Sequence, residues 1–262
     1  MKKVNPELIS SIEELPSGKK IYFASDFHLG APNAEESFHR EKKIIKWLEH
    51  ISSDASAIFL LGDTFDFWFE YKTTIPKGFI RFLGKLAELK DRGVQIFLFV
   101  GNHDLWLGDY FPNQLQIPVI RNTAELQVNG KKFFLGHGDG LGHGDTRFKV
   151  IKKIFTNSAC IWMFKWIHPD LGISIAKYWS SKSRASPSEE QFEGEDKERL
   201  FSYCKGVEKE IHHDYYVFGH RHLPLELAVS DTSTYVNLGE WITHCNYLEF
   251  DGNQATLKTF KG

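Results

Sequence analysis

Five short motifs of the sequence carry side chains that could do chemistry. Each motif follows a short apolar run and a Gly or another small residue, so each is expected where a buried strand ends. That position is the edge at which open α/β sheets bind ligands. The residues of the five motifs are Asp26, His28, Asp63, Asp66, Asn102, His103, His137, His220 and His222.

These residues offer oxygen and imidazole ligands and no thiolate, a set that favours Mn²⁺, Fe or Zn²⁺. Asp26 and His28 are two residues apart, and in extended backbone both would project to the same side and could hold one ion. His220 and His222 could do the same, or could divide between neighbouring ions. Two ions that share Asp63 would use more of these ligands than one tetrahedral ion can. Paired ions are the usual device for displacement at phosphorus.

The elements that must position these motifs alternate in type. Apolar runs predict strands at 21–24, 57–61 and 94–100, and amphipathic patterns predict helices at 35–51 and 77–92 between them. Strands that alternate with helices are typical of a parallel sheet with right-handed crossovers. Residues 1–20 are expected to be a polar lead-in.

The second half of the chain is expected to be mainly β. Asn129-Gly130 is a strong hairpin signal between two short apolar runs. A further helix is predicted at about 197–212. The predicted strands are 125–128, 132–135, 215–218, 225–229, 234–238, 246–250 and 255–260. The whole pattern predicts an α/β fold with two packed sheets, outer helices, and all polar motifs at one edge.

Residues 145–186 form a segment of different composition, which we expect to be a helical insertion into a core made of 1–144 and 187–262. Between Thr146 and Arg184 there are eight Lys or Arg and one Asp, and three of the seven tryptophans. The apolar stretches are shorter than the roughly 20 residues that a membrane-spanning helix needs. Such a segment suits a membrane surface or an amphiphilic ligand. A helical hairpin packed on the core with a solvated basic face is an equal alternative.

The bulk properties exclude several classes of protein. The chain has 262 residues and a formal net charge of −2, so no global basic field points to nucleic acid. Its three widely separated cysteines argue against a disulfide framework and fit a reducing compartment. The N-terminus has no apolar run of the kind found in signal peptides. We therefore expect a cytoplasmic protein.

The order and spacing of the motifs resemble those of the calcineurin-like metallophosphoesterases. The matching motifs are Asp26-Phe-His28, Gly62-Asp63-x-x-Asp66, Gly101-Asn102-His103-Asp104, Gly136-His137 and Gly219-His220-x-His222. The resemblance implies an αββα sandwich and two divalent metal ions, with Mn²⁺ expected first and Fe or Zn²⁺ as alternatives. It implies one ion held by Asp26, His28, Asp63 and His222, and a second held by Asp63, Asn102, His137 and His220.

The same resemblance implies roles for the remaining pair of motif residues. His103 is expected to contact the scissile phosphate and to assist the leaving group. Asp66 is expected to orient the imidazole ring of His103, as a carboxylate that fixes a histidine tautomer.

A narrower set of residues resembles the family of UDP-2,3-diacylglucosamine hydrolases of the lipid A pathway. That set adds Leu29, Phe65, Trp68, Gly138-Asp139, the basic insertion and Leu238-Gly239-x-Trp241. The resemblance implies hydrolysis of a pyrophosphate by water attack at the α-phosphorus, which releases UMP and 2,3-diacylglucosamine 1-phosphate. It implies a lipid-nucleotide substrate and peripheral association with the inner membrane. The substrate contacts that it implies are Asn102, His103, Asp145, Arg147, Ser183, Arg184 and His220.

The sequence departs from this narrower family at two positions. Many members have Arg where this chain has His103, and Glu where it has Asp66. This chain carries the pair that is found in the wider superfamily.

Three functions stay open at this point. The first is a hydrolase of a lipid nucleotide at a membrane surface, and the second is a general phosphodiesterase or phosphatase that acts on a soluble nucleotide. The basic aromatic insertion favours the first, because an enzyme with a soluble substrate has little use for it. The third is a non-catalytic scaffold for partner binding, which the retention of every expected metal ligand argues against.

Overall fold

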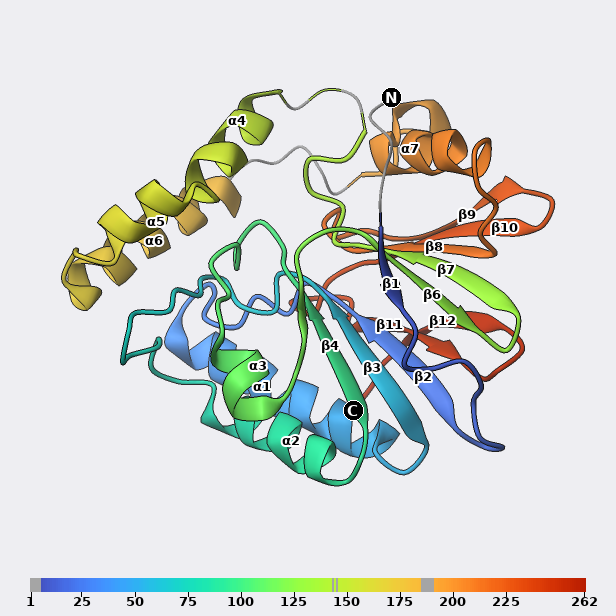
Figure 1. Cartoon of the computed structure of the whole chain (residues 1–262), viewed down its shortest axis with the longest axis horizontal. Coiled ribbons are helices and arrows are strands. Elements are labelled where there is room, and N and C mark those ends of the chain that lie inside the picture. The colour runs from blue at the N-terminus through green and yellow to red at the C-terminus, as the bar shows by residue number, and fades with distance from the viewer. Residues whose placement is uncertain (1–5, 143, 145, 185–190) are drawn as a thin grey trace.

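The computed structural model of the chain (Figure 1) contains two six-stranded sheets packed face to face. It describes residues 6–142, 144, 146–184 and 191–262, and only the backbone of 146–148, 177–179 and 181–184. Helices α1, α2 and α3 pack on the outer face of one sheet, and α7 packs on the outer face of the other. This αββα arrangement confirms the predicted fold class.

The first sheet has the strand order β12-β11-β2-β3-β4-β5. Four consecutive strands of this sheet are parallel: β2 (Lys20–Ala24), β3 (Ala55–Leu61), β4 (Gln95–Phe99) and the edge strand β5 (Val119–Ile120). Strands β11 (Asn246–Phe250) and β12 (Ala255–Thr259) extend the sheet antiparallel. Its covering helices are α1 (Ala34–Ile51), α2 (Ile80–Asp91) and α3 (Tyr110–Leu115).

The second sheet has the order β1-β6-β7-β8-β10-β9 and is mixed. Parallel pairs join β1 to β6, β7 to β8 and β8 to β10, and antiparallel pairs join β6 to β7 and β9 to β10. Helix α7 (Arg199–Glu208) covers it. The strands are β1 (Glu7–Ile9), β6 (Ala124–Val128), β7 (Lys131–Leu135), β8 (Tyr215–Phe218), β9 (Pro224–Ser230) and β10 (Ser233–Leu238).

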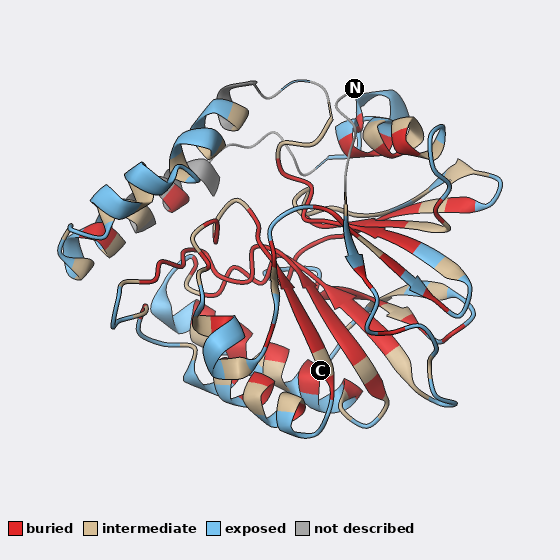
Figure 2. Ribbon diagram, in the orientation of Figure 1, coloured by how far each residue is buried: buried red, intermediate tan, exposed pale blue. Residues whose placement is uncertain are grey.

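Strand β3 shows why the central strands form. Successive side chains of a strand point to opposite faces, and in β3 both faces are apolar and buried, as Figure 2 shows for the middle of both sheets. Phe59 faces the other sheet and stacks on Phe97 with ring centroids 4.7 Å apart. Ile58 and Leu60 face the helices. A strand that is buried on both faces is typical of a parallel sheet.

The described residues from Thr146 to Arg184 form three α-helices that lie beside the two sheets rather than within either layer (Figure 1). They are α4 (Thr146–Phe155), α5 (Ser158–Phe164) and α6 (Pro169–Arg184). They sit over the edge at which β2, β3 and β4 end. The described part of this segment is thus helical.

Several predicted boundaries were wrong for local reasons. Helix α2 begins at Ile80 and not at 77, because Gly78 and Phe79 have φ values of 109° and 58°, which no α-helix contains. Helix α7 ends at Glu208 rather than at 212. The polar lead-in contains strand β1, which forms by pairing with β6. Strand β5 and helix α3 were not predicted. The Asn129-Gly130 turn was predicted correctly, with φ of 49° and 75°.

Candidate metal centre and active site

The motif residues of all five segments meet at one edge of the sandwich. Two follow β2, two follow β3, two follow β4, one follows β7 and two follow β8. The carboxyl ends of β2, β3 and β4 lie together because these strands are parallel neighbours. Strands β7 and β8 are also parallel neighbours in the facing sheet. The topology alone therefore brings residues from distant parts of the sequence to one place.

One cluster of four ligand groups contains Asp26, His28, Asp63 and His222, with one donor atom of each within 4.8 Å of the others. Nε2 of His222 lies 3.2 Å from Oδ1 of Asp26 and 3.0 Å from Nε2 of His28. Nε2 of His28 lies 3.8 Å from Oδ2 of Asp63. This is the set that the sequence resemblance assigns to the first ion.

The remaining candidate ligands also gather around Asp63 and Asn102. Nε2 of His137 is 3.3 Å from Oδ2 of Asp63 and 3.1 Å from Oδ1 of Asn102. Nδ1 of His220 is 2.9 Å from the same oxygen of Asn102. The other ring nitrogen of His137, Nδ1, donates a hydrogen bond of 2.8 Å to the main-chain oxygen of Leu61. This bond fixes the orientation of the ring. Asp63 thus lies between both sets.

The backbone that brings these groups together differs from the predicted one. Asp26 and His28 were expected in extended backbone, but their φ values are 55° and 43°. Asp63, His220 and His222 have φ values of 49°, 68° and 54°. All five residues therefore adopt the left-handed conformation, which is uncommon outside Gly but is tolerated best by Asn, Asp and His. These five side chains converge because the chain turns sharply after β2, β3 and β8.

Glycine is required next to one ligand for a steric reason. Gly62 has a φ of 90°, and a Cβ added there would lie 2.6 Å from Nδ1 of His137 and 2.9 Å from the main-chain nitrogen of Gly101. Neither neighbour can move without displacing a ligand loop. A side chain at this position would therefore disturb the cluster from within.

Buried acidic and basic groups hold the ligand loops in place. The carboxylate of Asp104 accepts hydrogen bonds from the main-chain nitrogens of Gly101 at 2.7 Å and Thr64 at 2.9 Å, and so ties the loop after β3 to the loop after β4. Nη2 of Arg40, on α1, donates to the main-chain oxygen of His28 at 2.8 Å. Both side chains are buried. The supporting roles of Asp104 and Arg40 were not predictable from the sequence, because both depend on contacts between segments that are distant in the chain.

The electrostatics of the cluster suit a cation. Burial alone would raise the pKa of Asp63, but His137 and His103 hold that pKa well below its usual range. Burial lowers the pKa of His28 to about 4, so its ring is neutral and can donate a lone pair. Burial and the charge of Asp63 raise the pKa of Asp104 to about 7. Burial alone would also raise the pKa of Asp26, but the nearby rings of His222 and His28 hold that pKa well below its usual range. The negative charge of the cluster is therefore carried by Asp26 and Asp63.

The donor set fits divalent metal ions. Within the described part of the chain, Oδ1 of the buried Asp26 makes no hydrogen bond, and its nearest ring nitrogen is Nε2 of His222. Two ring nitrogens, from His28 and His222, face each other at 3.0 Å beside it. Such a convergence of carboxylate oxygen and imidazole nitrogen is what first-row divalent ions bind. Buried charges are usually paired or coordinated to metal.

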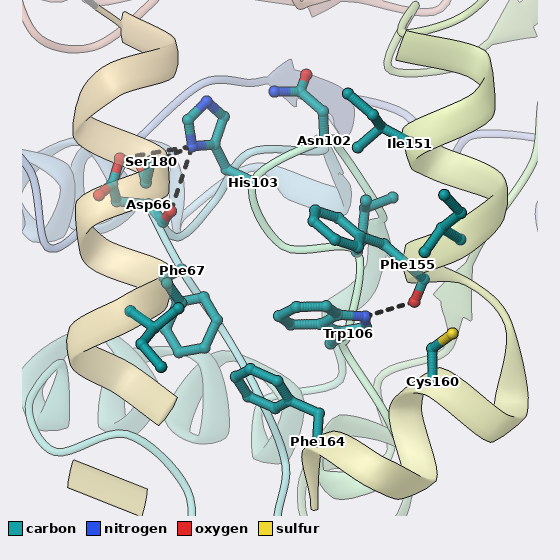
Figure 3. Close-up of a pocket in the computed structure, with 14 residues that line it drawn as sticks. Asp66, Phe67, Asn102, His103, Trp106, Ile151, Phe155, Cys160, Phe164 and Ser180 are labelled. Carbon is teal, nitrogen blue, oxygen red and sulfur yellow. Dashed lines mark hydrogen bonds and ion pairs between the residues drawn. The ribbon is translucent and has the colours of Figure 1, made fainter. Parts of the chain in front are cut away.

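His103 lies at the border between the metal cluster and the helices of the insertion (Figure 3). Its Nδ1 lies 3.2 Å from the main-chain oxygen of Asp66, 3.0 Å from Oγ of Ser180, and 3.6 Å from the Asp66 carboxylate. The nearer contact of Asp66 is therefore its main-chain oxygen, whereas its carboxylate was expected to orient the ring. Ser180 was missed in the sequence, where nothing distinguishes it from the other serines of α6.

A cavity of about 440 Å³ begins beside His103 and extends beneath the insertion (Figure 3). Asn102 and His103 line its end nearest the metal cluster, and Ser180 lies on its α6 side. The rest of its wall is mostly apolar. The remaining lining residues are Asp66, Phe67, Leu105, Trp106, Ile151, Ile154, Phe155, Cys160, Phe164, Ile175 and Ala176. A cleft of this size with few polar groups is typical of a ligand site.

Trp106 fastens the insertion to the core beside this cavity. Its Nε1 donates to the main-chain oxygen of Phe155 at 2.7 Å, and its ring lies 5.0 Å from that of Phe164. Nζ of Lys152, on α4, forms an ion pair with the buried carboxylate of Asp139. The insertion is thus joined to the core by polar contacts around an apolar space.

A second cavity of about 500 Å³ lies on another side of α6 and shares Asp66 and Phe67 with the first. It is bounded by the loop between β3 and α2 and by the start of α6. The tip of the insertion carries three exposed apolar side chains, Trp162, Met163 and Trp166, which are 61%, 56% and 76% exposed. No helix among the described residues is both long enough and apolar enough to cross a membrane.

Four of the predicted substrate contacts cannot be placed as side chains. Asp145 lies outside the described residues. Arg147 lies in α4, and Ser183 and Arg184 lie at the end of α6, but their side chains lie outside the description. Their predicted contacts stay predictions. Asn102 and His103 line the end of the first cavity, and Nδ1 of His220 lies 2.9 Å from Oδ1 of Asn102.

The chain is similar in sequence to two proteins that share one name. It is 36% identical over 258 residues to a UDP-2,3-diacylglucosamine hydrolase of Porphyromonas gingivalis, a match that covers 92% of this chain and 98% of that protein. It is 27% identical over 246 residues to a protein of the same name from Azotobacter vinelandii, a match that covers 90% of this chain and 96% of that one.

One solved structure that the chain matches is that of vacuolar protein sorting 29 from Cryptosporidium parvum. That match covers 94% of this chain and all of the other, with 10% identity and a TM-score of 0.45. Residues 19–224, which carry all five motifs, match the calcineurin-like phosphoesterase family. Membership of this family implies divalent metal ions, which agrees with the donor set described above. The chain therefore belongs to the calcineurin-like phosphoesterases and is a metal-dependent hydrolase.

Proposed function

We propose that this protein hydrolyses the pyrophosphate of UDP-2,3-diacylglucosamine in the lipid A pathway. Water attacks the α-phosphorus, and UMP and 2,3-diacylglucosamine 1-phosphate are released. The observation that carries the proposal is the apolar cavity of about 440 Å³ that begins at Asn102 and His103. A group of candidate metal ligands beside an apolar cavity suits a substrate in which a pyrophosphate is joined to a diacylated sugar. The names of the relatives from Porphyromonas gingivalis and Azotobacter vinelandii support the same substrate.

We assign two ion sites to the cluster. Asp26, His28, Asp63 and His222 would hold one ion, and Asp63, Asn102, His137 and His220 would hold the other. When bound, two divalent cations supply positive charge that polarises phosphoryl oxygens and lowers the pKa of an attacking water. Imidazole and carboxylate ligands are compatible with Mn²⁺, which we propose as the native metal.

His103 is the residue that we assign to the leaving group. Its Nδ1 is occupied by Asp66 and Ser180, while the other ring nitrogen points away from both partners (Figure 3). That second nitrogen can contact a phosphoryl oxygen and deliver a proton as the bond to phosphorus breaks. Asp66 holds the ring in place through its main-chain oxygen at 3.2 Å and its nearby carboxylate. A fixed ring is a condition for efficient proton transfer.

We propose that residues 145–186 act as a cap over the acyl chains, with 1–144 and 187–262 as the catalytic core. Aromatic and aliphatic side chains of α4, α5 and α6 line the cavity together with Trp106 of the core. Burial of acyl carbons against such walls contributes about 25 cal/mol for each Å² of apolar surface removed from water. We propose Asp145, Arg147, Ser183 and Arg184 as further substrate contacts, because the family resemblance of the sequence implies them.

The exposed tip of the cap supports peripheral association with the inner membrane. Trp162 and Trp166 pack edge to face with ring centroids 5.9 Å apart, and both are more than half exposed. Tryptophan is favoured at membrane interfaces, and the cap carries eight Lys or Arg to meet anionic lipid. A cytoplasmic enzyme with a lipid substrate could reach it in this way without a spanning helix.

The test is an assay of the purified protein with Mn²⁺ on UDP-2,3-diacylglucosamine and on bis(p-nitrophenyl) phosphate, a soluble diester. We expect release of UMP from the lipid nucleotide. An Asp63→Ala variant prepared in parallel controls for contaminating hydrolases. Turnover of the soluble diester alone would contradict the substrate assignment and leave a general phosphodiesterase. Inactivity on both substrates, with no metal retained, would favour the scaffold.

A further inference from the structure

The turn that carries His220 and His222 has a costly backbone conformation. Both residues are left-handed, with φ values of 68° and 54°. Residues in sparsely populated regions of this kind persist only where the surrounding structure over-determines them. This conformation directs the His222 ring towards Asp26 and His28 and the His220 ring towards Asn102, which are all candidate metal ligands. Contacts outside the cluster must therefore help to hold this turn.

Arg221, the residue between the two histidines, makes such a contact. Its Nε donates to both carboxylate oxygens of Glu198, at 2.9 Å and 3.1 Å. Its main-chain nitrogen donates to the oxygen of Gly219 at 2.8 Å. The Glu198 side chain is only 3% exposed and that of Arg221 is 15% exposed. The pair is thus buried, and a buried charge-assisted bond is among the strong hydrogen bonds of a protein.

Glu198 is well placed to act as an anchor. It is the residue immediately before α7, and α7 packs on the outer face of its sheet. Leu200, two residues further along the chain, packs against Gly138. A Cβ added at Gly138 would lie 2.8 Å from Cδ1 of Leu200. Gly138 follows His137. The start of α7 therefore touches two loops that carry candidate ligands.

We propose that Glu198 and Arg221 are positioning residues, whose ion pair holds the turn from His220 to His222 in its cation-binding conformation. The inference does not depend on which phosphoester is hydrolysed. It assigns the pair a role in metal affinity rather than in contact with substrate or metal. Partners that orient a metal ligand from outside typically contribute 10–100-fold to metal affinity or activity.

Electrostatics and positioning predict opposite results for one variant, Arg221→Met. Removal of the guanidinium takes away a positive charge near the cluster and leaves the carboxylate of Glu198 in place. If charge alone mattered, the variant would bind a divalent cation more tightly. If the ion pair holds the turn, the variant binds more weakly because the two rings are no longer aimed together.

The experiment is calorimetric titration of Mn²⁺ into metal-free protein. We expect Arg221→Met and Glu198→Gln each to weaken Mn²⁺ binding at least about tenfold. Arg221→Lys keeps the charge without the Nε donor, so its affinity should lie between that of Arg221→Met and that of the parent. The control is Arg92→Met, because Arg92 pairs with Glu88 at 3.2 Å on the exposed end of α2. Its Mn²⁺ affinity should not change.

A thermal melt of each metal-free variant separates positioning from loss of fold. Any variant that melts below the titration temperature is excluded, and Arg221→Lys then carries the test as the least disruptive change. Parent-like Mn²⁺ affinity in the folded variants, even with a lowered Tm, would overturn the proposal and leave the pair a structural one. Tighter binding by Arg221→Met would overturn it as well.

Discussion

The main-chain nitrogen of His103 donates a 2.8 Å hydrogen bond to Oδ1 of Asp63. The second oxygen of that carboxylate, Oδ2, lies 3.3 Å from His137 and 3.8 Å from His28. One side chain therefore holds the loop after β4 through one oxygen and faces both candidate ion sites through the other. The carboxylate of Asp63 thus contacts both the loop that carries His103 and the candidate metal ligands His137 and His28.

Asp63→Ala is expected to abolish activity. Both proposed ions lose a ligand, and loss of a ligand should exceed the 10–100-fold cost that is typical of its outer partners. The measurements are kcat on the lipid nucleotide and metal content by mass spectrometry. Asp231→Ala, in the exposed turn between β9 and β10, is the matched control and should behave as the parent. Retention of two ions and of activity in Asp63→Ala would refute the bridging role.

His103→Ala is expected to lower kcat by about 10²-fold or more, which is the usual contribution of a positioned acid or base. Metal content should stay at the parent level, because the hydrogen bond to Asp63 comes from the main chain and survives the substitution. The two measurements are kcat at saturating substrate and metal per protein. Loss of metal in this variant would contradict the role assigned to the side chain.

Ala176→Phe tests the cavity under the cap. Ala176 lines the cavity of about 440 Å³, and a larger side chain would occupy the space proposed for an acyl chain. We expect KM for the diacylated substrate to rise about tenfold, which corresponds to about 1.4 kcal/mol of binding free energy. Hydrolysis of a small soluble diester should not change.

Leu171→Phe, on the same helix but in neither cavity, is the control for Ala176→Phe. Both variants place Phe on α6, so any effect of Phe on the stability of this helix would appear in both variants. An equal rise in KM for the two variants, or an equal loss on both substrates, would mean that the cap has a structural role only.

The ionised carboxylate of Glu208 is expected to stabilise the folded state, and this stabilisation should be lost at acidic pH. Burial raises the pKa of this carboxyl, but hydrogen bonds from His212, Tyr216 and Ser233 outweigh burial and lower the pKa to about 2. The folded-state pKa is thus below the unfolded value of about 4.5. The stabilisation is present above pH 4.5 and is lost as the pH falls towards 2.

Glu208→Gln removes this titration. With allowance for solvent screening, we expect it to lower the free energy of unfolding by about 1–2 kcal/mol at pH 7, and by less at pH 3. Urea denaturation of the parent and the variant at both pH values measures the difference. A difference that is the same at pH 7 and pH 3 would show that Glu208 does not titrate in this range.

The sequence was sufficient for the elements that are set by local pattern. Strand β3 was predictable because Ala57–Leu61 is apolar on both faces, and the Asn129-Gly130 turn because both residues tolerate positive φ. Strand β1 could not be predicted in the same way. Its three residues, Glu7–Ile9, have no pattern of their own and become a strand by pairing with β6.

The candidate ligands could be named from the sequence, but the reason for their convergence could not. Spacing suggested that Asp26 and His28 share one side of an extended strand, whereas both lie in left-handed backbone that only the folded context stabilises. Ser180 was not found because a lone serine on a helix carries no signal until its distance from His103 is known. The cavity was unpredictable for the same reason, since its walls come from four separate segments.

The left-handed backbone at Asp26, His28, Asp63, His220 and His222 also limits how this protein can change over evolutionary time. Aspartate and histidine serve both as ligands that divalent ions prefer and as residues that accept positive φ more readily than most. A mutation to a β-branched residue at such a position would lose a ligand and strain the turn together. A lineage that lost the activity would therefore pass more easily through Asn or Gly, which both tolerate positive φ. The three turns would then keep their shape after the metal ligands are gone.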